Sequence, residues 1–459
     1  MENQIVKVGD ELIIEIKKQG INGEGIGYHN KLAVFVQGAI LRESVKCRIT
    51  TALPNYAQAD LLSIEKASEK RVVPPCPYYA DCGGCQMQHI AYDEQRKIKQ
   101  SILKQSLRRY TELDVDRMDI LNTIGMAKNF GYRNKSQMPL HNTNFGLALG
   151  LYQPNSNHFV PIEECLVQDS VVNSTNRIVL DLLKQHGLLA YDAMNKEGVL
   201  LHLVTRHFVS TGDIQITFVV TKPLAVLRDI AREIMNKIAN VKSISFSVNM
   251  RKSTSIFGRD VFLLAGVKEI ETKYAGMTFK VAADAFHQLN DHQMDILYKI
   301  IIEMMGLTGT EIVIDAFSGI GITSLLFAKL SHKVYGVDFS APAIESAKQN
   351  AKINKIMNVE FIADRVERWL PEHVEQVGIP DVLVFDPPRT GLDDSIIALL
   401  NRIPIPKVIY VSCNQSTLAK NLDRLSAAYR VETIRPIDMF PHTASVESIT
   451  LLTRREIAK

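Results

Sequence analysis

The stretch Glu311-Ile312-Val313-Ile314-Asp315-Ala316-Phe317-Ser318-Gly319-Ile320-Gly321 is an apolar strand that runs into a turn with two glycines. Glycines at the carboxyl end of a strand let the backbone approach a ligand closely. The third glycine of a dinucleotide fingerprint is missing, because Ser324 occupies its place. The turn therefore indicates a ligand site, and it does not favour a pyrophosphate over a smaller cofactor.

Regular alternation of strands and helices surrounds this turn. A helix is expected over 291–305 before it and another over 322–330 after it. Further strands are expected over 333–337, 359–363, 381–385 and 408–411, with a helix over 341–354 between the first two. Such alternation predicts a mostly parallel sheet with helices on both faces, an α/β Rossmann-like domain over 290–459.

Four of these strands end in an acidic residue: Asp315, Asp338, Asp364 and Asp386. At the second strand end, a carboxylate can accept both hydroxyls of a ribose, and Asp364 can hold an adenine amino group. Each aspartate alone could be an ordinary turn residue or helix cap. Together they predict a nucleoside cofactor. S-adenosylmethionine fits best, because its sulfonium tolerates nearby carboxylates whereas a pyrophosphate would not.

Two residues beyond the cofactor motifs suggest the chemistry. Cys413 follows the apolar strand 408–411, and Glu447 closes the segment 440–447. A thiolate that adds to carbon 6 of a pyrimidine makes carbon 5 nucleophilic, and a carboxylate can then remove the carbon-5 proton. The alternatives are a packing cysteine and a surface carboxylate at a strand start. Arg389, in Asp386-Pro387-Pro388-Arg389, stands where amino-group methyltransferases usually carry an aromatic residue, which favours a carbon target.

The rest of the chain divides into two parts. Residues 1–66 alternate apolar and polar residues between glycine turns, which predicts a small OB-like β-barrel that could bind RNA or serve only as a structural module. Cys47 is expected to face its core. A proline-rich linker, 69–77, opens a mixed α+β central domain over 67–289. A helix with an apolar face is expected there over 93–110, followed by mixed strands and helices over about 121–286.

The chain has six cysteines, and four of them form a group: Cys76, Cys82, Cys85 and Cys165. Clustered cysteines in a cytosolic protein are typical of metal ligands or catalytic groups. Four thiolates suit either zinc or an iron–sulfur cluster, and the spacing does not decide between them.

These motifs together resemble the RNA uracil-5-methyltransferase family, in the branch that modifies 23S ribosomal RNA. The resemblance includes an N-terminal barrel similar to the TRAM domain, the four cysteines, the motif Phe286-His287-Gln288-Leu289-Asn290, Asp-Pro-Pro-Arg, Ser-Cys-Asn and the C-terminal glutamate. It implies a class I methyltransferase fold, Cys413 as nucleophile and Glu447 as base. It also implies a [4Fe–4S] cluster on the four cysteines. The residues that it places against S-adenosylmethionine are Gln288, Phe317, Asp338, Asp364 and Asp386.

The partner expected is therefore ribosomal RNA with a uridine that is flipped or lies in a loop. The net charge of the 459 residues, +3, does not prove a polyanionic partner. The basic stretch 96–135 could follow a phosphate backbone or be a solvated helix face. Within it, Tyr132-Arg133-Asn134-Lys135 could stack on a base and bind phosphate, or be a strand edge.

Three other functions stay open at this stage: a tRNA uracil-5-methyltransferase, an amino-group methyltransferase, and a non-catalytic iron–sulfur RNA-binding protein. No apolar stretch has the length of a membrane helix, and the first four residues lack the start of a signal peptide. We therefore expect a cytoplasmic protein, and a monomer.

Overall fold

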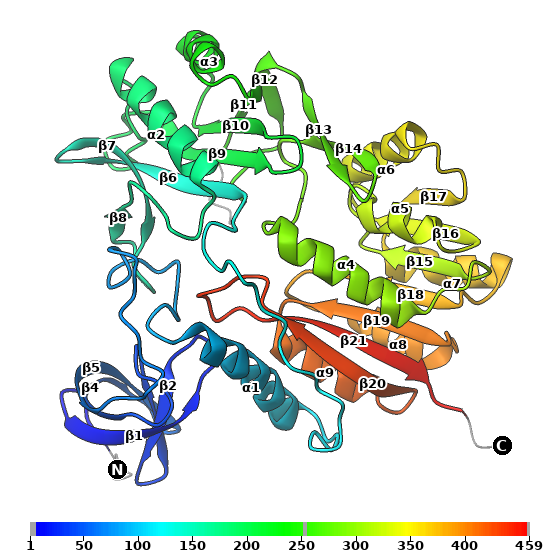
Figure 1. Cartoon of the computed structure of the whole chain (residues 1–459), viewed down its shortest axis with the longest axis horizontal. Helices are drawn as coiled ribbons and strands as arrows, with labels where there is room; N and C mark the ends of the chain where they lie inside the picture. The colour runs from blue at the N-terminus through cyan, green and yellow to red at the C-terminus, as the bar shows by residue number, and fades with distance from the viewer. Residues whose placement is uncertain (1–5, 251–254, 457–459) are drawn as a thin grey trace.

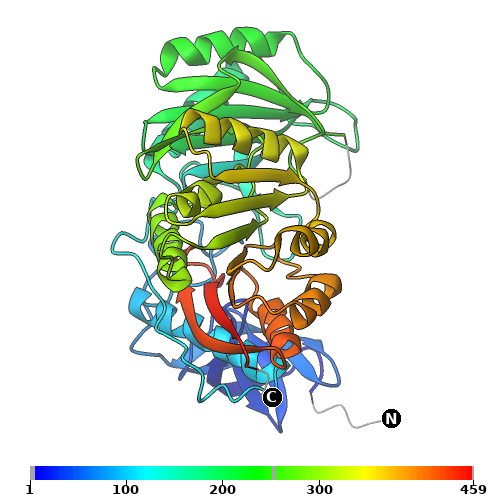
Figure 2. The same ribbon diagram turned by 90° about the vertical axis from the view of Figure 1, so that its right-hand side faces the viewer.

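The computed structural model describes residues 6–250 and 255–456. The first residues, on which the expectation about a signal peptide rests, lie outside this range. Figure 2 shows the described chain as three tiers: a sheet of the central region at the top, the C-terminal sheet in the middle, and the N-terminal barrel at the bottom. The predicted boundaries at residues 66 and 289 stay predictions.

The N-terminal tier is a closed barrel with the strand order β1-β2-β3-β5-β4. Alternate residues such as Ile14, Ile16, Val34 and Val36 fill its interior. Cys47 is fully buried among them, as predicted. The strands are β1 (Glu11–Gln19), β2 (Gly25–His29), β3 (Leu32–Val36), β4 (Ser44–Ala52) and β5 (Tyr56–Lys66).

An ion pair between the buried Glu43 and the half-buried Arg71 attaches the barrel to the chain that follows it. Arg71 donates from Nε and Nη2 to the two carboxylate oxygens of Glu43, at 2.6 and 2.7 Å. Its Nη2 also donates to the carbonyl oxygen of Gly38. Such two-pronged pairing fixes orientation as well as distance. The barrel is therefore held at a defined angle to the central region.

The central region contains a seven-stranded sheet in the order β12-β11-β10-β9-β6-β7-β8. Two helices, α2 and α3, cover one face of it (Figure 1). The elements are α1 (Tyr92–Tyr110), β6 (Lys135–Thr143), β7 (Gly146–Tyr152), β8 (Phe159–Pro161), α2 (Ser170–Gln185), β9 (Leu200–Phe208), β10 (Asp213–Val220), α3 (Val226–Lys237), β11 (Val241–Val248) and β12 (Val261–Gly266). A hairpin, β13 (Glu269–Tyr274) and β14 (Met277–Ala282), leads from it to the C-terminal tier.

The C-terminal sheet has the order β17-β16-β15-β18-β19-β21-β20, and only β21 runs antiparallel to the other strands. The chain moves outward from β15 to β16 and then crosses back to β18. Ligands of open α/β sheets bind at such a switch point, outside the carboxyl ends of the strands. The strands are β15 (Ile312–Ala316), β16 (Lys333–Asp338), β17 (Val359–Ala363), β18 (Val382–Phe385), β19 (Lys407–Ser412), β20 (Tyr429–Ile437) and β21 (Glu447–Arg454).

Helices cover both faces of this sheet, as the alternating pattern predicts. On one face lie α4 (Asp291–Met305), α5 (Ile322–Ala328) and α6 (Ala341–Ile353). On the other lie α7 (Val366–Val377), α8 (Asp394–Arg402), α9 (Gln415–Leu425) and the central-region helix α1. The expected α/β class is thus confirmed, and α1 belongs to the core of the C-terminal tier rather than to that of the central sheet.

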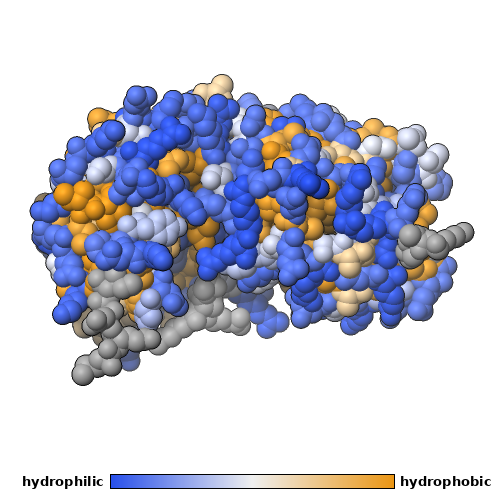
Figure 3. Space-filling view, turned by 90° about the horizontal axis from the view of Figure 1, so that it is seen from below, coloured by the Kyte–Doolittle hydropathy of each residue, from blue (hydrophilic) through white to orange (hydrophobic). Residues whose placement is uncertain are grey.

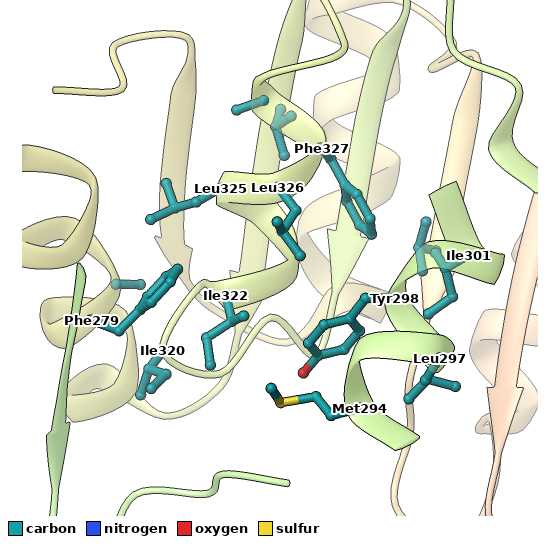
Figure 4. Packing of buried hydrophobic residues seen from close by; sticks show 14 of the residues in the cluster. Phe279, Met294, Leu297, Tyr298, Ile301, Ile320, Ile322, Leu325, Leu326 and Phe327 are labelled. Atoms are coloured by element: carbon teal, nitrogen blue, oxygen red, sulfur yellow. The ribbon is translucent and has the colours of Figure 1, made fainter. Parts of the chain in front are cut away.

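Helix α4 brings the segment before it against the switch point. Its buried residues Leu297, Tyr298 and Ile301 pack towards Phe327 of α5 (Figure 4). Burying such a side chain contributes about 1.5–3 kcal/mol. The Asn290 side chain caps the helix by accepting from Gln293 N, and Gly306 ends it in the left-handed conformation. Both ends are therefore fixed by local sequence, which places the preceding residues 284–288 at the site.

The surface seen in Figure 3 is mostly hydrophilic, with apolar residues in patches between polar ones. Within residues 6–250 and 255–456, no helix combines the length and the apolar composition needed to cross a membrane.

Candidate active site

A cavity of about 310 Å³ lies at the switch point of the C-terminal sheet. The turn after β15, the end of β16, the start of α6 and residues 284–288 form its walls. Four of the five residues predicted to contact the cofactor line it: Gln288, Phe317, Asp338 and Asp386. The fifth, Asp364, is not among the lining residues. Its carboxylate instead accepts from Arg368 at 2.5 Å and from the backbone N of Arg365 at 2.6 Å.

Asp338 links the two loops that close the cavity. Its Oδ2 accepts from the backbone N of Gly319 at 3.0 Å, and its Oδ1 accepts from the backbone N of Ser340 at 2.8 Å. An ionised carboxylate has about four lone-pair sites, so each oxygen retains capacity for a further donor. The carboxylate is thus oriented by the backbone and remains able to accept two hydroxyls.

The turn after β15 has an uncommon backbone. Phe317, Gly319 and Gly321 all have positive φ, and the φ of Phe317 is 68°. For a bulky residue this conformation is strained, and such strain clusters at ligand sites. Gly321 is required for a second reason, because a Cβ there would lie 2.6 Å from the Phe361 ring. The sequence motif therefore reflects both a bent backbone and tight packing beneath it.

Asp315 has a different role from the other strand-end carboxylates. Its Oδ2 accepts from Ser324 Oγ at 2.5 Å and from Thr323 Oγ1 at 2.7 Å. Burial raises its pKa to about 6 despite these bonds. Ser324, which takes the place of a fingerprint glycine, thus binds the first acidic residue and ties α5 to β15.

Cys413 and Glu447 lie side by side. Ser412 and Ser448 are paired in the antiparallel ladder of β19 and β21. Cys413 follows the first of these, and Glu447 precedes the second, so the two are neighbours one step beyond the last pair. Both side chains are half-buried. A separation of 34 residues in sequence is thus closed by strand pairing alone.

Burial, and then nearby carboxylates, raise the pKa values of both groups. Burial, followed by the nearby carboxylates of Glu447 and Asp386, raises the pKa of the Cys413 thiol to about 11. Burial and Asp386 raise the pKa of Glu447 to about 8. Arg389 acts in the opposite direction on both. The enclosing protein and Asp315 raise the pKa of Asp386 to about 7, although its side chain is open to the cavity. At neutral pH the free site therefore favours the protonated forms of Cys413 and Glu447.

A buried polar network holds the loop that leads to Glu447. Lys99 of α1 forms an ion pair with Asp438, and both side chains are fully buried. Lys99 Nζ also donates to the carbonyl oxygen of Phe440 at 3.0 Å, and Tyr92 Oη donates to Asp438 Oδ2 at 2.9 Å. The sequence placed Lys99 in a basic stretch, and no local signal distinguished it from its exposed neighbours.

His442 is a structural part of the same loop. Its ring stacks on Phe130 at 4.0 Å, and its backbone N donates to Gln95 Oε1. Burial lowers its pKa to about 4. Its carbonyl oxygen accepts from the backbone N of Gln86 and of Met87, next to Cys85. The ring is therefore neutral at physiological pH and fixed by its neighbours.

The four clustered cysteines come from two segments that meet beside this loop. Cys85 and Cys165 pack with Tyr132 and Phe440 in one small apolar cluster. Burial, followed by the nearby Cys165, Cys82 and Cys76, raises the pKa of the Cys85 thiol, and none of the four forms a disulfide. Across the described residues, however, no three His, Cys, Asp or Glu side chains are arranged to hold a metal ion. The four thiols suit a cluster by their chemistry and not by their arrangement, and the cluster stays a prediction.

The residues of the motif Tyr132-Arg133-Asn134-Lys135 have different surroundings in the fold. Tyr132 is buried and its Oη donates to the carbonyl oxygen of Pro441 at 3.0 Å. Its ring is therefore not a free stacking surface for a base. Asn134 Nδ2 donates to the carbonyl oxygen of Gln288 and to Asp291, so the motif lies against the cofactor cavity. Lys135 begins β6.

This fold, with a carboxylate-lined cavity at its switch point, defines a class I S-adenosylmethionine-dependent methyltransferase. The comparison with protein families then specifies it. The family described as tRNA (Uracil-5-)-methyltransferase matches residues 91–455, and the TRAM domain matches residues 6–62. The chain belongs to this family of RNA uracil-5-methyltransferases and carries a TRAM domain at its N-terminus. The predicted family and fold are both confirmed.

Similar proteins cover nearly the whole chain. An RNA methyltransferase of Halalkalibacterium halodurans is 40% identical over 452 residues, 98% of each chain. One of Listeria innocua is 40% identical over 457 residues, 99% of this chain and all of the relative. Among solved structures, the Pyrococcus abyssi tRNA (uracil-54, C5)-methyltransferase in complex with S-adenosyl-L-homocysteine has a TM-score of 0.76. It is 25% identical and covers 96% of this chain and 99% of its own.

Proposed function

We propose that this chain methylates carbon 5 of a uridine in 23S ribosomal RNA, with Cys413 as the nucleophile and Glu447 as the base. The observation that carries the chemistry is the adjacency of these two side chains at the end of the β19–β21 ladder. A thiol and a carboxylate side by side can serve addition to, and proton removal from, neighbouring carbons of one ring.

One cavity residue has a hydrogen-bonding group without a partner, as expected where S-adenosylmethionine binds. Ser318 lines the cavity, and its buried Oγ has no partner among the described residues. Buried polar atoms are almost always paired, so this hydroxyl is suited to a ligand. Gln288, Phe317, Asp338 and Asp386 would hold the cofactor, with Asp364 beyond the wall. Bound there, the cofactor supplies the methyl group.

The residues of the chain account for the remaining steps. The Cys413 thiolate forms a bond to carbon 6 of uracil, and the electron pair of the carbon 5–carbon 6 double bond moves towards the carbonyl oxygen at carbon 4 as an enolate. After carbon 5 has gained its methyl group, the ionised carboxylate of Glu447 takes the carbon-5 proton, so Glu447 has to lose the proton that its raised pKa favours before this step. The electrons of the carbon 5–hydrogen bond restore the carbon 5–carbon 6 double bond. The sulfur–carbon 6 bond breaks, and Cys413 leaves as a thiolate with the electrons of that bond.

Cys413 must lose its proton before it can add to the ring. The pKa of the Cys413 thiol is raised, so the thiolate forms only when a neighbouring group stabilises it or takes its proton. Arg389 is the cation that lowers the pKa values of both Cys413 and Glu447. In this position it would stabilise the thiolate as the base enters.

Formation of a covalent adduct tests this assignment. RNA that contains 5-fluorouridine cannot lose a proton from carbon 5, so wild-type enzyme is expected to remain attached through Cys413. Cys413→Ala should form no adduct and no 5-methyluridine, whereas Cys47→Ala, in the barrel core, should retain both wherever it folds. Methylation by the Cys413→Ala protein would refute the nucleophile.

The ribosomal target rests on the resemblance in the TRAM barrel and the four cysteines. A tRNA target is the second candidate, and a specific observation favours it. The Pyrococcus abyssi tRNA enzyme matches 96% of this chain, barrel included, so a barrel does not by itself separate the two substrates. Mapping 5-methyluridine in both RNAs from a strain without this gene decides between them: loss from 23S RNA alone supports the proposal, and loss from tRNA alone refutes it.

We also infer that the four cysteines bind a [4Fe–4S] cluster. What supports it is the neighbourhood of four free thiols from two segments, which a cluster would have to draw closer together, and the family resemblance. Protein purified without oxygen should show the broad visible absorption of such a cluster and contain iron and sulfide. Zinc in their place would refute this assignment without affecting the methyl transfer.

A further inference from the structure

Lys135 and Arg206 form a pair of cations on one face of the central sheet. Lys135 of β6 is the direct cross-strand partner of Arg206 of β9, and Arg206 is in turn the partner of Gln215 of β10. Directly opposed residues project from the same face of a sheet. The other face is covered by α2 and α3. The two cations therefore lie on the face opposite these helices.

This pair is buried without a salt bridge, and the nearest carboxylates that act on it are Asp284 and, for Arg206, also Asp291. Lys135 is only 8% exposed and Arg206 only 2% exposed. In the described chain, neither forms a salt bridge, and neither does Arg133 beside them. Arg206 instead donates to the carbonyl oxygens of Ala285 and Ala282, at 2.8 and 3.4 Å. The ammonium group of Lys135 lies 5.5 Å from the centre of the Phe257 ring.

The electrostatic consequence is a lysine that holds its proton weakly. Burial, with repulsion from Arg206 and Arg133, lowers the pKa of Lys135 to about 7, and only Asp284 acts against this. A buried charge that makes no salt bridge is costly, and here Asp284 acts on Lys135 only from a distance. A site that retains such a cost is a candidate for binding an anion.

The cations lie beside the wall of the catalytic cavity. Asp284, Ala285 and His287 all line that cavity, and the first two are the residues that Lys135 and Arg206 approach. The backbone next to Lys135 is fixed to the same wall, since Asn134 binds the carbonyl oxygen of Gln288. An anion at Lys135 would therefore lie next to the pocket that must receive the base.

We infer that Lys135, with Arg133 and Arg206 around it, binds a backbone phosphate of the RNA strand next to the uridine that enters the cavity. RNA is the polyanion that this family brings to the site, and lysine and arginine are the usual phosphate ligands. A strand that extrudes one base must be held on the flanking backbone, and a fixed phosphate does so without reading sequence. The inference rests on RNA as the substrate and not on which RNA it is.

The test is Lys135→Met, which keeps most of the side-chain length and removes the charge. Its matched control is Lys184→Met, an exposed lysine on α2, over the opposite face of the same sheet. Affinity for a uridine-containing RNA oligonucleotide is measured across a series of salt concentrations. We expect about a tenfold loss for the first variant, with the salt slope reduced by about 0.7 for one contact to single-stranded RNA. The control should match wild type.

Two further measurements make the result specific. Affinity for S-adenosylhomocysteine should be unchanged in Lys135→Met, and its melting temperature should be equal or higher because a buried unpaired cation is gone. In a second experiment, each phosphate of the oligonucleotide is replaced in turn by a neutral methylphosphonate. One of these replacements should weaken binding by the wild-type protein and leave binding by Lys135→Met unchanged.

An unchanged salt slope would overturn the inference. Weaker cofactor binding with normal RNA binding would assign the cations to the cofactor carboxylate instead. A fall in melting temperature with normal RNA affinity would make Lys135 a structural residue. Failure of the nucleophile assignment is distinguishable from all of these, because it removes the 5-fluorouridine adduct while RNA affinity is retained.

Discussion

Cys413 and Glu447 emerge from adjacent antiparallel strands one residue beyond the Ser412–Ser448 pair, so that the β19–β21 ladder alone sets their spacing. Gln415 stabilises this end of the ladder, since its Oε1 accepts from Ser448 Oγ and its Nε2 donates to the carbonyl oxygen of Val446. The two side chains are thus mounted on paired strands rather than on independent loops. Their proposed division of labour can be tested one residue at a time.

Glu447→Gln should convert the enzyme into a trap for unmodified RNA. The amide cannot remove the carbon-5 proton, so the methylated ring would stay attached to Cys413. We expect turnover to fall by at least about a hundredfold, the scale of general-base catalysis. A denaturing gel should show an RNA–protein band that Cys413→Ala abolishes. Glu375→Gln, an exposed change on α7, should turn over normally, and normal turnover by Glu447→Gln would contradict the assignment.

Glu447 should also make stability fall as pH rises. Its pKa is about 8 in the folded protein, above the ordinary 4.5, so between these values the folded state binds more protons than the unfolded state. Stability therefore decreases as pH rises from about 4.5 to about 8. Thermal unfolding at pH 5, 6, 7 and 8 should show a shallower decline in Glu447→Gln than in wild type. Equal slopes would show that the carboxyl group titrates normally. Asp386 and Asp315 have raised pKa values too, so part of the decline should remain.

Two lysines on one helix should differ sharply in their contribution to folding. Lys99→Met leaves Asp438 as a fully buried carboxylate without its cation, and we expect a loss of about 3–5 kcal/mol in the free energy of unfolding. Lys97→Met removes an exposed i,i+3 pair with Glu94 and should cost about 0.5 kcal/mol or less. Urea unfolding measures both. Asp438→Asn added to Lys99→Met should recover part of the loss, since it removes the orphaned charge.

These two lysines also show how far the sequence could predict the structure. Periodicity predicted helix α1 to within one residue, because an apolar stripe is a local property. Which polar residue on that helix is buried depends on Asp438, over 300 residues away, and no local pattern contains it. The strand ends were predictable for the same local reason. The hydrogen bond from Ser324 to Asp315 was not, because the sequence does not indicate which residue a serine side chain will bind.

The two acidic residues predicted to bind the nucleoside should not be equivalent. Asp338 lines the cavity and orients both of its loops, whereas the carboxylate of Asp364 is taken by Arg368 and lies outside the wall. Asp338→Asn should weaken S-adenosylhomocysteine binding by about tenfold or more, the equivalent of one charge-assisted hydrogen bond. Asp364→Asn should change it by about threefold or less. Calorimetric titration of both variants gives the comparison. An equal or larger effect at Asp364 would mean that its carboxylate leaves Arg368 when the cofactor binds, and Arg368→Met would then tighten binding.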